Sequence, residues 1–199
     1  TEEANRLMGI ALAARGGAQW VVGERVSCDA FWRGLGSPSS RVCSEQILFE
    51  VTSPGQETDL HVRLGDENDY EWLFWAASEM VKEDLDLPWA GKTEPVFADR
   101  IRTSLRAGAE YVGFLENERV YRAKCGVQCP YGAQIGGIWV NPSVRGRGVG
   151  RSCTLALTRK LLAASPRVTL HVRSDNHAAI RCYESIGYEP IRAFRLLVR

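Results

Sequence analysis

Hydrophobic and polar positions alternate in a way that predicts helices and strands in close succession over most of the chain. Strands are expected at 60–64, 110–115, 119–127, 134–140, 168–172 and 193–198, and helices at 70–85, 95–107, 148–164 and 176–186. Turn residues at 116–118 and 129–132 join the middle strands as antiparallel hairpins. Hairpins followed by strand–helix–strand units indicate a mixed α/β sheet flanked by helices.

Residues 1–51 repeat part of this outline. A helix to about residue 15, a strand at 19–22, a helix at 27–35 and a strand at 42–51 follow the same order as the elements from 148 to 199. Few identities accompany the match, so a degenerate repeat and a chance alternation both stay open. The polar, turn-rich stretch 53–57 is the best linker candidate. We therefore predict two regions, a partial one at 1–57 and a complete domain at 58–199.

Composition and charge narrow the class of protein. The 199 residues include 25 Lys+Arg and 24 Asp+Glu, a net charge of +1, which argues against a dedicated nucleic-acid binder. No apolar run approaches the roughly 18 residues that span a bilayer. The first residues lack the basic and apolar regions of a signal peptide, and the missing initiator Met leaves truncation open. Six cysteines without an export signal are expected to be reduced thiols, so we predict a cytoplasmic protein without membrane or nucleic-acid partners.

The most informative segment runs from Ile138 to Arg151. An apolar strand ends at Val140 and leads into a turn rich in Gly and Arg, which opens a helix. Glycines let backbone approach a ligand closely, and the free N–H groups of a helix N-terminus favour a phosphate. The spacing satisfies neither Gly-x-Gly-x-x-Gly nor the P-loop pattern. The local chemistry predicts a pyrophosphate site, and a flexible basic loop is the alternative.

The pattern Arg145-x-x-Gly148-x-Gly150 after a strand resembles the pyrophosphate loop of the GNAT superfamily of acyl-CoA N-acyltransferases. Downstream, the segment from Asn176 through Tyr183 to Tyr188 is similar to that superfamily's second signature, an Asn that opens a helix, a Tyr seven residues later and a closing Gly-Tyr. The resemblance covers about residues 59–199. Residues 1–57 also resemble the degenerate GNAT-like half that precedes the active half in some bacterial proteins.

The resemblance implies a GNAT-like, mostly antiparallel twisted sheet and acetyl-CoA as co-substrate. Strands 134–140 and 168–172, the fourth and fifth of the family's sheet, would splay apart to admit the cofactor, with a β-bulge at Gly136-Gly137 whose N–H faces the thioester oxygen. Cys125 and Cys129 lack the second ligand pair of a zinc site, so no metal is expected. The cofactor-binding residues implied are Ile138, Trp139, Val140, Arg145, Gly146, Arg147, Gly148, Val149, Gly150, Arg151, Asn176 and Tyr183.

For catalysis, the resemblance makes Tyr183 the general acid that protonates the departing thiolate; a core tyrosine is the alternative. Asn176 would contact the cofactor, cap its helix, or do both. The sequence does not identify the general base. We name Glu83, at the acidic end of helix 70–85, as the candidate, and Glu79 and Asp84 are further candidates there. The alternative is that this helix end is only a solvated acidic surface. His171 is expected to be structural.

These features predict an enzyme, an acyltransferase that moves an acetyl group from acetyl-CoA to a primary amine by direct attack in a ternary complex. A non-catalytic acyl-CoA binding or sensing module is the alternative, and a phosphate-binding adaptor is a weaker one. The acceptor would be a small-molecule amine or a protein or peptide amine, and a homodimer is compatible with the sequence. Trp72, Trp75 and Trp89 are candidates for the acceptor pocket, with core packing as the default for the first two.

Overall fold

The computed structural model describes residues 1–53, 55, 59–85 and 94–199. Within them the helices are α1 (Glu2–Ala13), α2 (Arg25–Gly34), α3 (Tyr70–Leu85), α4 (Glu94–Arg106), α5 (Val149–Leu162) and α6 (His177–Glu184). The strands are β1 (Trp20–Glu24), β2 (Val42–Val51), β3 (Val62–Leu64), β4 (Glu110–Leu115), β5 (Glu118–Cys129), β6 (Gly132–Val140), β7 (Val168–Arg173) and β8 (Glu189–Val198). The 57/58 boundary and Trp89 lie outside the described residues, so the two predicted regions stay a prediction.

The strands follow one another in hydrogen-bonding order β1-β8-β2-β7-β6-β5-β4-β3. Neighbours pair antiparallel at β1–β8, β3–β4, β4–β5 and β5–β6, whereas β6 and β7 run parallel. The predicted fold class, a mixed and mostly antiparallel sheet flanked by helices, is confirmed. The chain divides into two compact units: unit 1 is 1–49 with 171–181 and 189–199, and unit 2 is 50–170 with 182–188.

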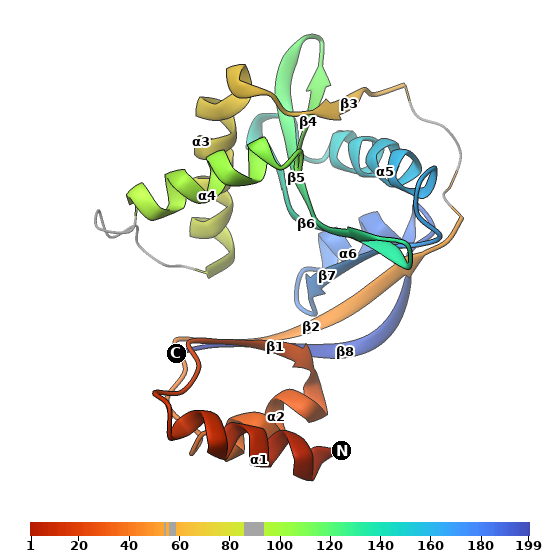
Figure 1. Ribbon diagram of the computed structural model, residues 1–199. Helices are drawn as coiled ribbons and strands as arrows, with labels where there is room; N and C mark the ends of the chain where they lie inside the picture. Colours follow the sequence, from red (N-terminus) through yellow and green to blue (C-terminus); the bar gives the residue numbers. More distant parts are fainter. Residues whose placement is uncertain (54, 56–58, 86–93) are drawn as a thin grey trace. The chain divides into compact units, whose positions relative to one another are not determined.

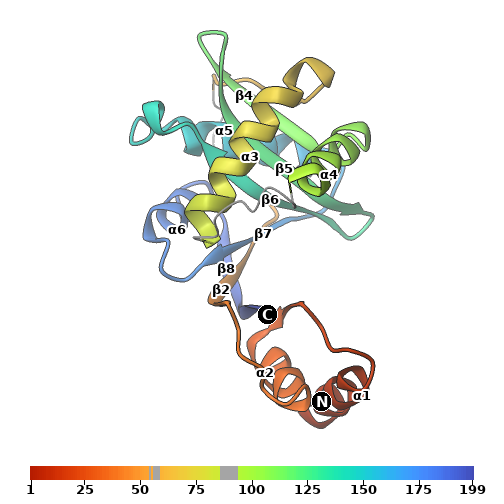
Figure 2. The same ribbon diagram turned by 90° about the vertical axis from the view of Figure 1, so that its left-hand side faces the viewer.

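Unit 2 contains the strands β3 to β6, covered on one face by α3 and α4 and on the other by α5 (Figures 1 and 2). The α3/α4 face buries a cluster of apolar side chains from both helices and from β4: Leu73, Ala77, Ile101, Leu105 and Val112. On the α5 face, the Tyr121 hydroxyl lies 3.2 Å from Oγ1 of Thr154. Both faces are thus filled, which makes the sheet a rigid support for groups at its edges.

The start of α3 is fixed by a buried carboxylate. The Asp66 side chain accepts a hydrogen bond from the Asn68 N–H and so caps the short 3₁₀ helix η1 (Glu67–Asp69) before α3. Asp69 is fully buried and binds the guanidinium groups of Arg63 and Arg119 at 2.6 and 2.7 Å. This ion-pair network ties the start of α3 to β3 and to β5.

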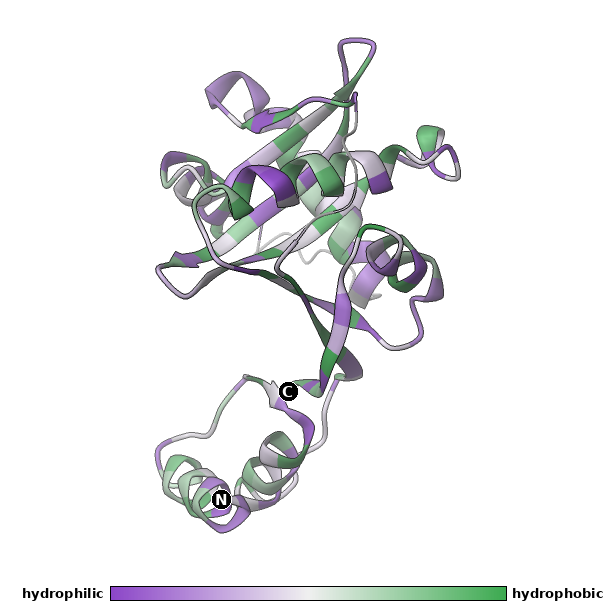
Figure 3. Cartoon of the chain, turned by 90° about the vertical axis from the view of Figure 1, so that its right-hand side faces the viewer, coloured by the Kyte–Doolittle hydropathy of each residue, from purple (hydrophilic) through white to green (hydrophobic). Residues whose placement is uncertain are grey.

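Unit 1 contains α1, α2, β1 and β8. The helices approach closely at two glycines, since a Cβ on Gly9 would lie only 2.2 Å from the Phe31 carbonyl and one on Gly34 2.0 Å from the Arg6 carbonyl. Hydrophobic and hydrophilic positions alternate along both helices (Figure 3). Among the described helices of the chain, none has the length and apolar character needed to cross a membrane. All six cysteines are free thiols.

Candidate active site

The turn between β6 and α5 has the geometry of an anion site. After the short helix η2 (Pro142–Val144), Gly146 and Gly148 adopt φ of 76° and 78°, values that favour glycine. Gly148 is the N-cap of α5 and provides no side-chain cap, and the first backbone bond of the helix runs from the Ser152 N–H to the Gly148 carbonyl. The N–H groups of 149–151 therefore lack intrahelical acceptors, and the helix dipole makes them suited to a phosphate.

A further glycine lets the first turn of α5 lie against the end of β6. A Cβ on Gly150 would meet Cγ2 of Val140 at 2.9 Å, so a side chain at this position would push the helix away from the strand. The close approach sets the free N–H groups beside the last residues of β6. The sequence placed the predicted pyrophosphate loop and the predicted pantetheine strand one after the other, and the structure brings them into contact.

The arginines of the loop do not all surround that site. Nη2 of Arg145 lies 2.9 Å from both carboxylate oxygens of Glu83, and its Nε donates to the Val140 carbonyl. Arg151 donates to the side chain and the carbonyl of Ser185. Arg147 is exposed. The guanidinium groups of Arg145 and Arg151 thus have protein partners, so the backbone N–H groups form the better defined part of the anion site.

Strand β6 offers an unpaired edge next to this loop. Over the described residues, the register of β6 with β7 covers only Ala133–Ile135 against Val168–Leu170, so the stretch from Gly136 to Val140 has no partner on β7. The register with β5 slips between Arg122 and Lys124, where two β6 residues, Gly137 and Ile138, lie opposite one residue. A bulge is therefore present, but it lies at Gly137-Ile138, one residue later than the expected Gly136-Gly137, because Gly136 still pairs with Lys124.

Trp139 anchors this part of β6 to α3. It is 3% exposed, its ring packs edge-on against Trp72 and Trp75, and its Nε1 donates to Glu83 at 3.2 Å. Trp72 and Trp75 are therefore part of this aromatic cluster, although Trp75 keeps 42% of its surface exposed. The predicted base, Glu83, accepts hydrogen bonds from Trp139 and Arg145 together, so in this structure its carboxylate is engaged with the protein.

Tyr183, the predicted acid, lies near the end of α6 and is 7% exposed. Burial raises the pKa of its phenol, and the neighbouring Cys182, Tyr188 and Asp84 raise it further. A phenol with a raised pKa keeps its proton throughout the neutral range, as a proton donor must.

Two other predicted residues belong to unit 1. The Asn176 side chain accepts a hydrogen bond from the Ala179 N–H at 3.1 Å and so caps α6; its contact with the cofactor stays a prediction. The His171 ring packs edge-on against Phe194, and burial lowers its pKa. His171 therefore has a packing role, as expected.

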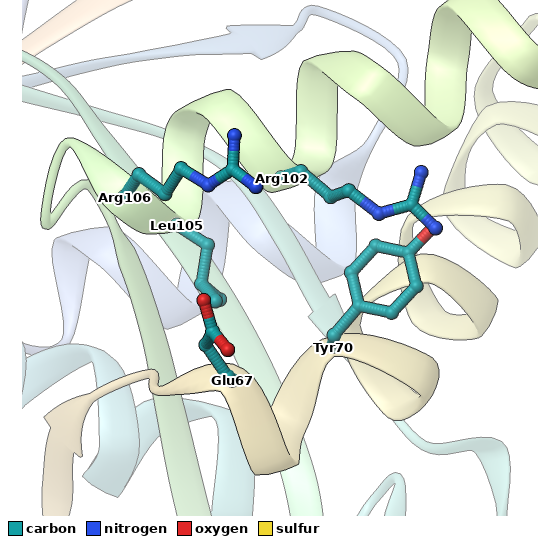
Figure 4. Close-up of a pocket in the computed structure, with 5 residues that line it drawn as sticks. All are labelled: Glu67, Tyr70, Arg102, Leu105 and Arg106. Carbon is teal, nitrogen blue, oxygen red and sulfur yellow. The ribbon is translucent and has the colours of Figure 1, made fainter.

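Two features escaped the sequence analysis. Arg122 and Glu110 form an ion pair inside unit 2, in which they are 3% and 1% exposed. The signal in the sequence was a charged residue in each of the two strands expected at 110–115 and 119–127. In addition, a cavity of about 190 Å³ lies between the start of α3 and the end of α4 (Figure 4). Its lining, Glu67, Tyr70, Arg102, Leu105 and Arg106, includes none of the predicted site residues.

Metal ligation finds no support in the described part of the chain, where no cluster of three or more His, Cys, Asp or Glu side chains has the arrangement of a metal site. The residues near the β6–α5 turn are instead backbone donors, a phenol and a carboxylate. Such a set can bind a phosphate and move protons.

Solved structures share this architecture. An acetyltransferase of the GNAT family from Novosphingobium aromaticivorans aligns with a TM-score of 0.65 and 18% identity over 95% of this chain and 78% of that one. A GNAT-family acetyltransferase from Colwellia psychrerythraea aligns with a TM-score of 0.62 and 12% identity over 98% of this chain and 73% of that one. At these identities the alignments establish the fold, which is that of GNAT acetyltransferases.

Sequence relatives point the same way. Residues 111–196 match the family model described as FR47-like protein. The N-alpha-acetyltransferase RimI of Mycobacterium tuberculosis is 35% identical over 88 residues, 43% of this chain and 50% of that relative. Mycothiol acetyltransferase of Nocardiopsis dassonvillei is 48% identical over 52 residues, 26% of this chain and 16% of that relative. The chain thus spans half or less of the length of these relatives. Together with the fold, these matches support membership of the GNAT superfamily and confirm the resemblance.

Proposed function

We propose that this protein transfers an acetyl group from acetyl-CoA to a primary amine. The observation that carries the proposal is the junction of β6 and α5, where two glycines in the left-handed region, Gly146 and Gly148, precede free N–H groups beside an unpaired strand edge. A pyrophosphate fits such N–H groups, and an extended arm with amide groups fits an open strand edge. Coenzyme A combines these two chemical features in one molecule.

Acetyl-CoA would supply an activated acetyl group as a thioester, and residues of the chain would bind and orient it. We assign the pyrophosphate to the backbone N–H groups of 146–151 and the pantetheine arm to the backbone of Ile138, Trp139 and Val140. The Arg145 N–H, which was expected to join them, donates to the Pro142 carbonyl instead. The positively charged Arg147 is exposed beside this turn and adds to its attraction for an anion. Asn176 is assigned to the cofactor through the superfamily pattern.

The chemistry proposed is direct attack in a ternary complex. The neutral amine nitrogen forms a bond to the thioester carbonyl carbon, the carbon–sulfur bond breaks, and the thiolate takes the phenolic proton of Tyr183. The nitrogen of the new amide gives up its extra proton, which restores the Tyr183 phenol. Burial raises the pKa of the Tyr183 phenol, so the hydroxyl carries its proton at neutral pH and has one to give as the more basic charge develops on the departing sulfur. Glu83 is the proposed base for the ammonium proton, reached once Arg145 turns from it toward the phosphates of the cofactor.

The acceptor is proposed at the level of its chemistry. RimI is named as an N-alpha-acetyltransferase and the relative from Nocardiopsis dassonvillei as a mycothiol acetyltransferase, so the relatives include at least two kinds of named activity. We propose an amine on a small molecule or on a protein or peptide chain. We propose that the amine enters beside two groups of α3. One is Trp75, which is partly exposed and packs against Trp139 of β6, and the other is the acidic end of the helix.

The test is acetyl-CoA-dependent thiol release with a panel of amino acids, polyamines, amino thiols and peptides with free N-termini. We expect release with at least one amine class, and loss of release in Gly148→Asp, whose carboxylate would repel the pyrophosphate. The matched control is Gly108→Asp, a glycine with φ of 65° after α4 that lies outside the proposed site. Binding of acetyl-CoA without turnover on any amine would favour the alternative, a non-catalytic acyl-CoA binding module.

A further inference from the structure

The buried ion pair of unit 2 contacts the bulge in β6. Nη1 of Arg122 donates to the Gly137 carbonyl at 3.1 Å, and Nη2 of the same guanidinium donates to Oε1 of Glu110 at 2.9 Å. The Ser104 hydroxyl, on α4, donates to that same carboxylate oxygen. One connected set of hydrogen bonds therefore runs from α4 through β4 and β5 to the backbone of the bulge.

Stability alone does not account for this arrangement. Arg122 and Glu110 are almost fully buried, and Oε2 of Glu110 and Nε of Arg122 have no hydrogen-bond partner among the described residues. Burying two charges has a large desolvation cost, and apolar residues of similar volume often stabilise a core at least as well. What the pair does provide is a donor at a fixed position, aimed at one backbone carbonyl.

That carbonyl belongs to the residue that shapes the bulge. Gly137 has φ of 59°, and a Cβ there would lie 3.0 Å from Nη1 of Arg122, so both the backbone conformation and the close guanidinium favour glycine. A planar trans peptide directs its C=O and its N–H in opposite directions. Because the Gly137 carbonyl points to the Arg122 guanidinium, the Ile138 N–H of the same peptide points away from that guanidinium, in a stretch of β6 that the described register leaves without a partner on β7.

We propose that Arg122 is a positioning residue, which, held by Glu110, orients the Gly137–Ile138 peptide so that the Ile138 N–H faces the acyl oxygen of the bound thioester. This inference rests on the proposed function, since the open edge of β6 is the proposed location of the thioester. As the amine attacks, negative charge develops on that oxygen, and a preorganised N–H donor stabilises it. Arg122 touches neither substrate; it acts through the backbone.

The decisive experiment separates positioning from stability. Arg122→Met is expected to lower kcat by about 100-fold, the size of effect that follows a small misplacement of catalytic groups, while KM for acetyl-CoA changes little. The double variant Arg122→Met/Glu110→Gln removes both charges, so its melting temperature should recover while kcat stays low. Recovery of kcat together with the melting temperature would overturn the proposal, as would a raised KM at unchanged kcat.

A matched control variant and a second measurement distinguish a positioning role of Arg122 from a purely structural one. Asp69→Asn breaks the other buried carboxylate network of unit 2, which does not reach β6, and should lower the melting temperature without lowering kcat. In the acetyl-CoA complex, where the Ile138 N–H is proposed to donate to the acyl oxygen, its hydrogen exchange should be slow in the wild type and in Asp69→Asn and faster in Arg122→Met; equal exchange in both variants would refute the positioning role. A wild-type chain without turnover on any amine would contradict the proposed function, whereas the exchange readout would still decide the role of Arg122.

Discussion

Replacing Tyr183 by Phe should separate catalysis from binding and from stability. Tyr183 and Tyr188 have rings 6.0 Å apart, both phenols are buried, and burial raises the pKa of each. Their hydroxyl groups differ in one respect. The Tyr188 hydroxyl forms a buried hydrogen bond of 2.9 Å with Thr158. The two residues therefore form a matched pair in which one hydroxyl is assigned to proton transfer and the other to structure.

The magnitudes follow from these assignments. Loss of a general acid lowers kcat by about 10²- to 10⁴-fold, so the kcat of Tyr183→Phe should fall by that factor while its affinity for acetyl-CoA stays unchanged. Tyr188→Phe should keep kcat and lose about 1 to 1.5 kcal/mol of unfolding free energy, because a buried hydrogen bond is removed. That loss corresponds to a fall in melting temperature of roughly 2 to 6 °C for a chain of this size.

Thiol release under saturating amine and acetyl-CoA gives kcat, calorimetric titration gives the affinity, and thermal unfolding gives stability. In the wild type, the raised pKa keeps the Tyr183 phenol protonated beyond the ordinary tyrosine range. A plot of kcat against pH should therefore show no fall from deprotonation of this acid up to about pH 10. Equal kcat in Tyr183→Phe and the wild type, or an equal loss of kcat in both Phe variants, would refute the assignment of Tyr183 as the acid.

Three further changes have defined outcomes. Glu83→Gln should tighten acetyl-CoA binding by up to about fivefold in calorimetry, because it frees Arg145 from an exposed ion pair; weaker binding would show that the pair supports the site. Asp69→Asn should cost about 2 to 3 kcal/mol in urea unfolding near pH 7. Burial opposes ionisation of Asp69, but hydrogen bonds from two arginines and a backbone N–H outweigh it and lower its pKa. The stabilisation is thus present above the ordinary carboxyl pKa and lost as the pH falls through the lowered value, so the deficit should shrink in acid; a constant deficit would contradict the ion-pair role. Gly148→Ala should cost about 1 to 2 kcal/mol in thermal unfolding, because φ is 78° and no atom obstructs the new methyl group, and an unchanged melting temperature would contradict the left-handed backbone.

Much of the fold was predictable because local patterns agree with the tertiary structure. The helix expected at 70–85 and the strands expected at 42–51 and 110–115 have the bounds of α3, β2 and β4. In each case the periodicity of apolar residues and the flanking turn residues point to the same element. The anion-binding turn between β6 and α5 was likewise predictable, since closely spaced glycines between a strand and a helix are typical of backbone that approaches a phosphate.

What the sequence did not reveal depends on contacts between distant residues. The spacing of Arg145 placed it in the loop, but its long side chain reaches Glu83, a partner 62 residues away that no local pattern could identify. The contact of Arg122 with Glu110 follows from the β4–β5 register. The membership of 171–181 and 189–199 in the same compact unit as 1–49 is also a property of long-range packing, which no linker signal could reveal.

The central claim is that the turn between β6 and α5 binds acetyl-CoA. Isothermal titration calorimetry of acetyl-CoA into the wild-type chain and into Gly148→Asp tests it most directly, because it requires no knowledge of the acceptor. We predict saturable binding at one site per chain in the wild type, with the affinity lost in Gly148→Asp and retained in Gly108→Asp. Absence of binding at millimolar acetyl-CoA, or equal affinity in all three proteins, would contradict the claim.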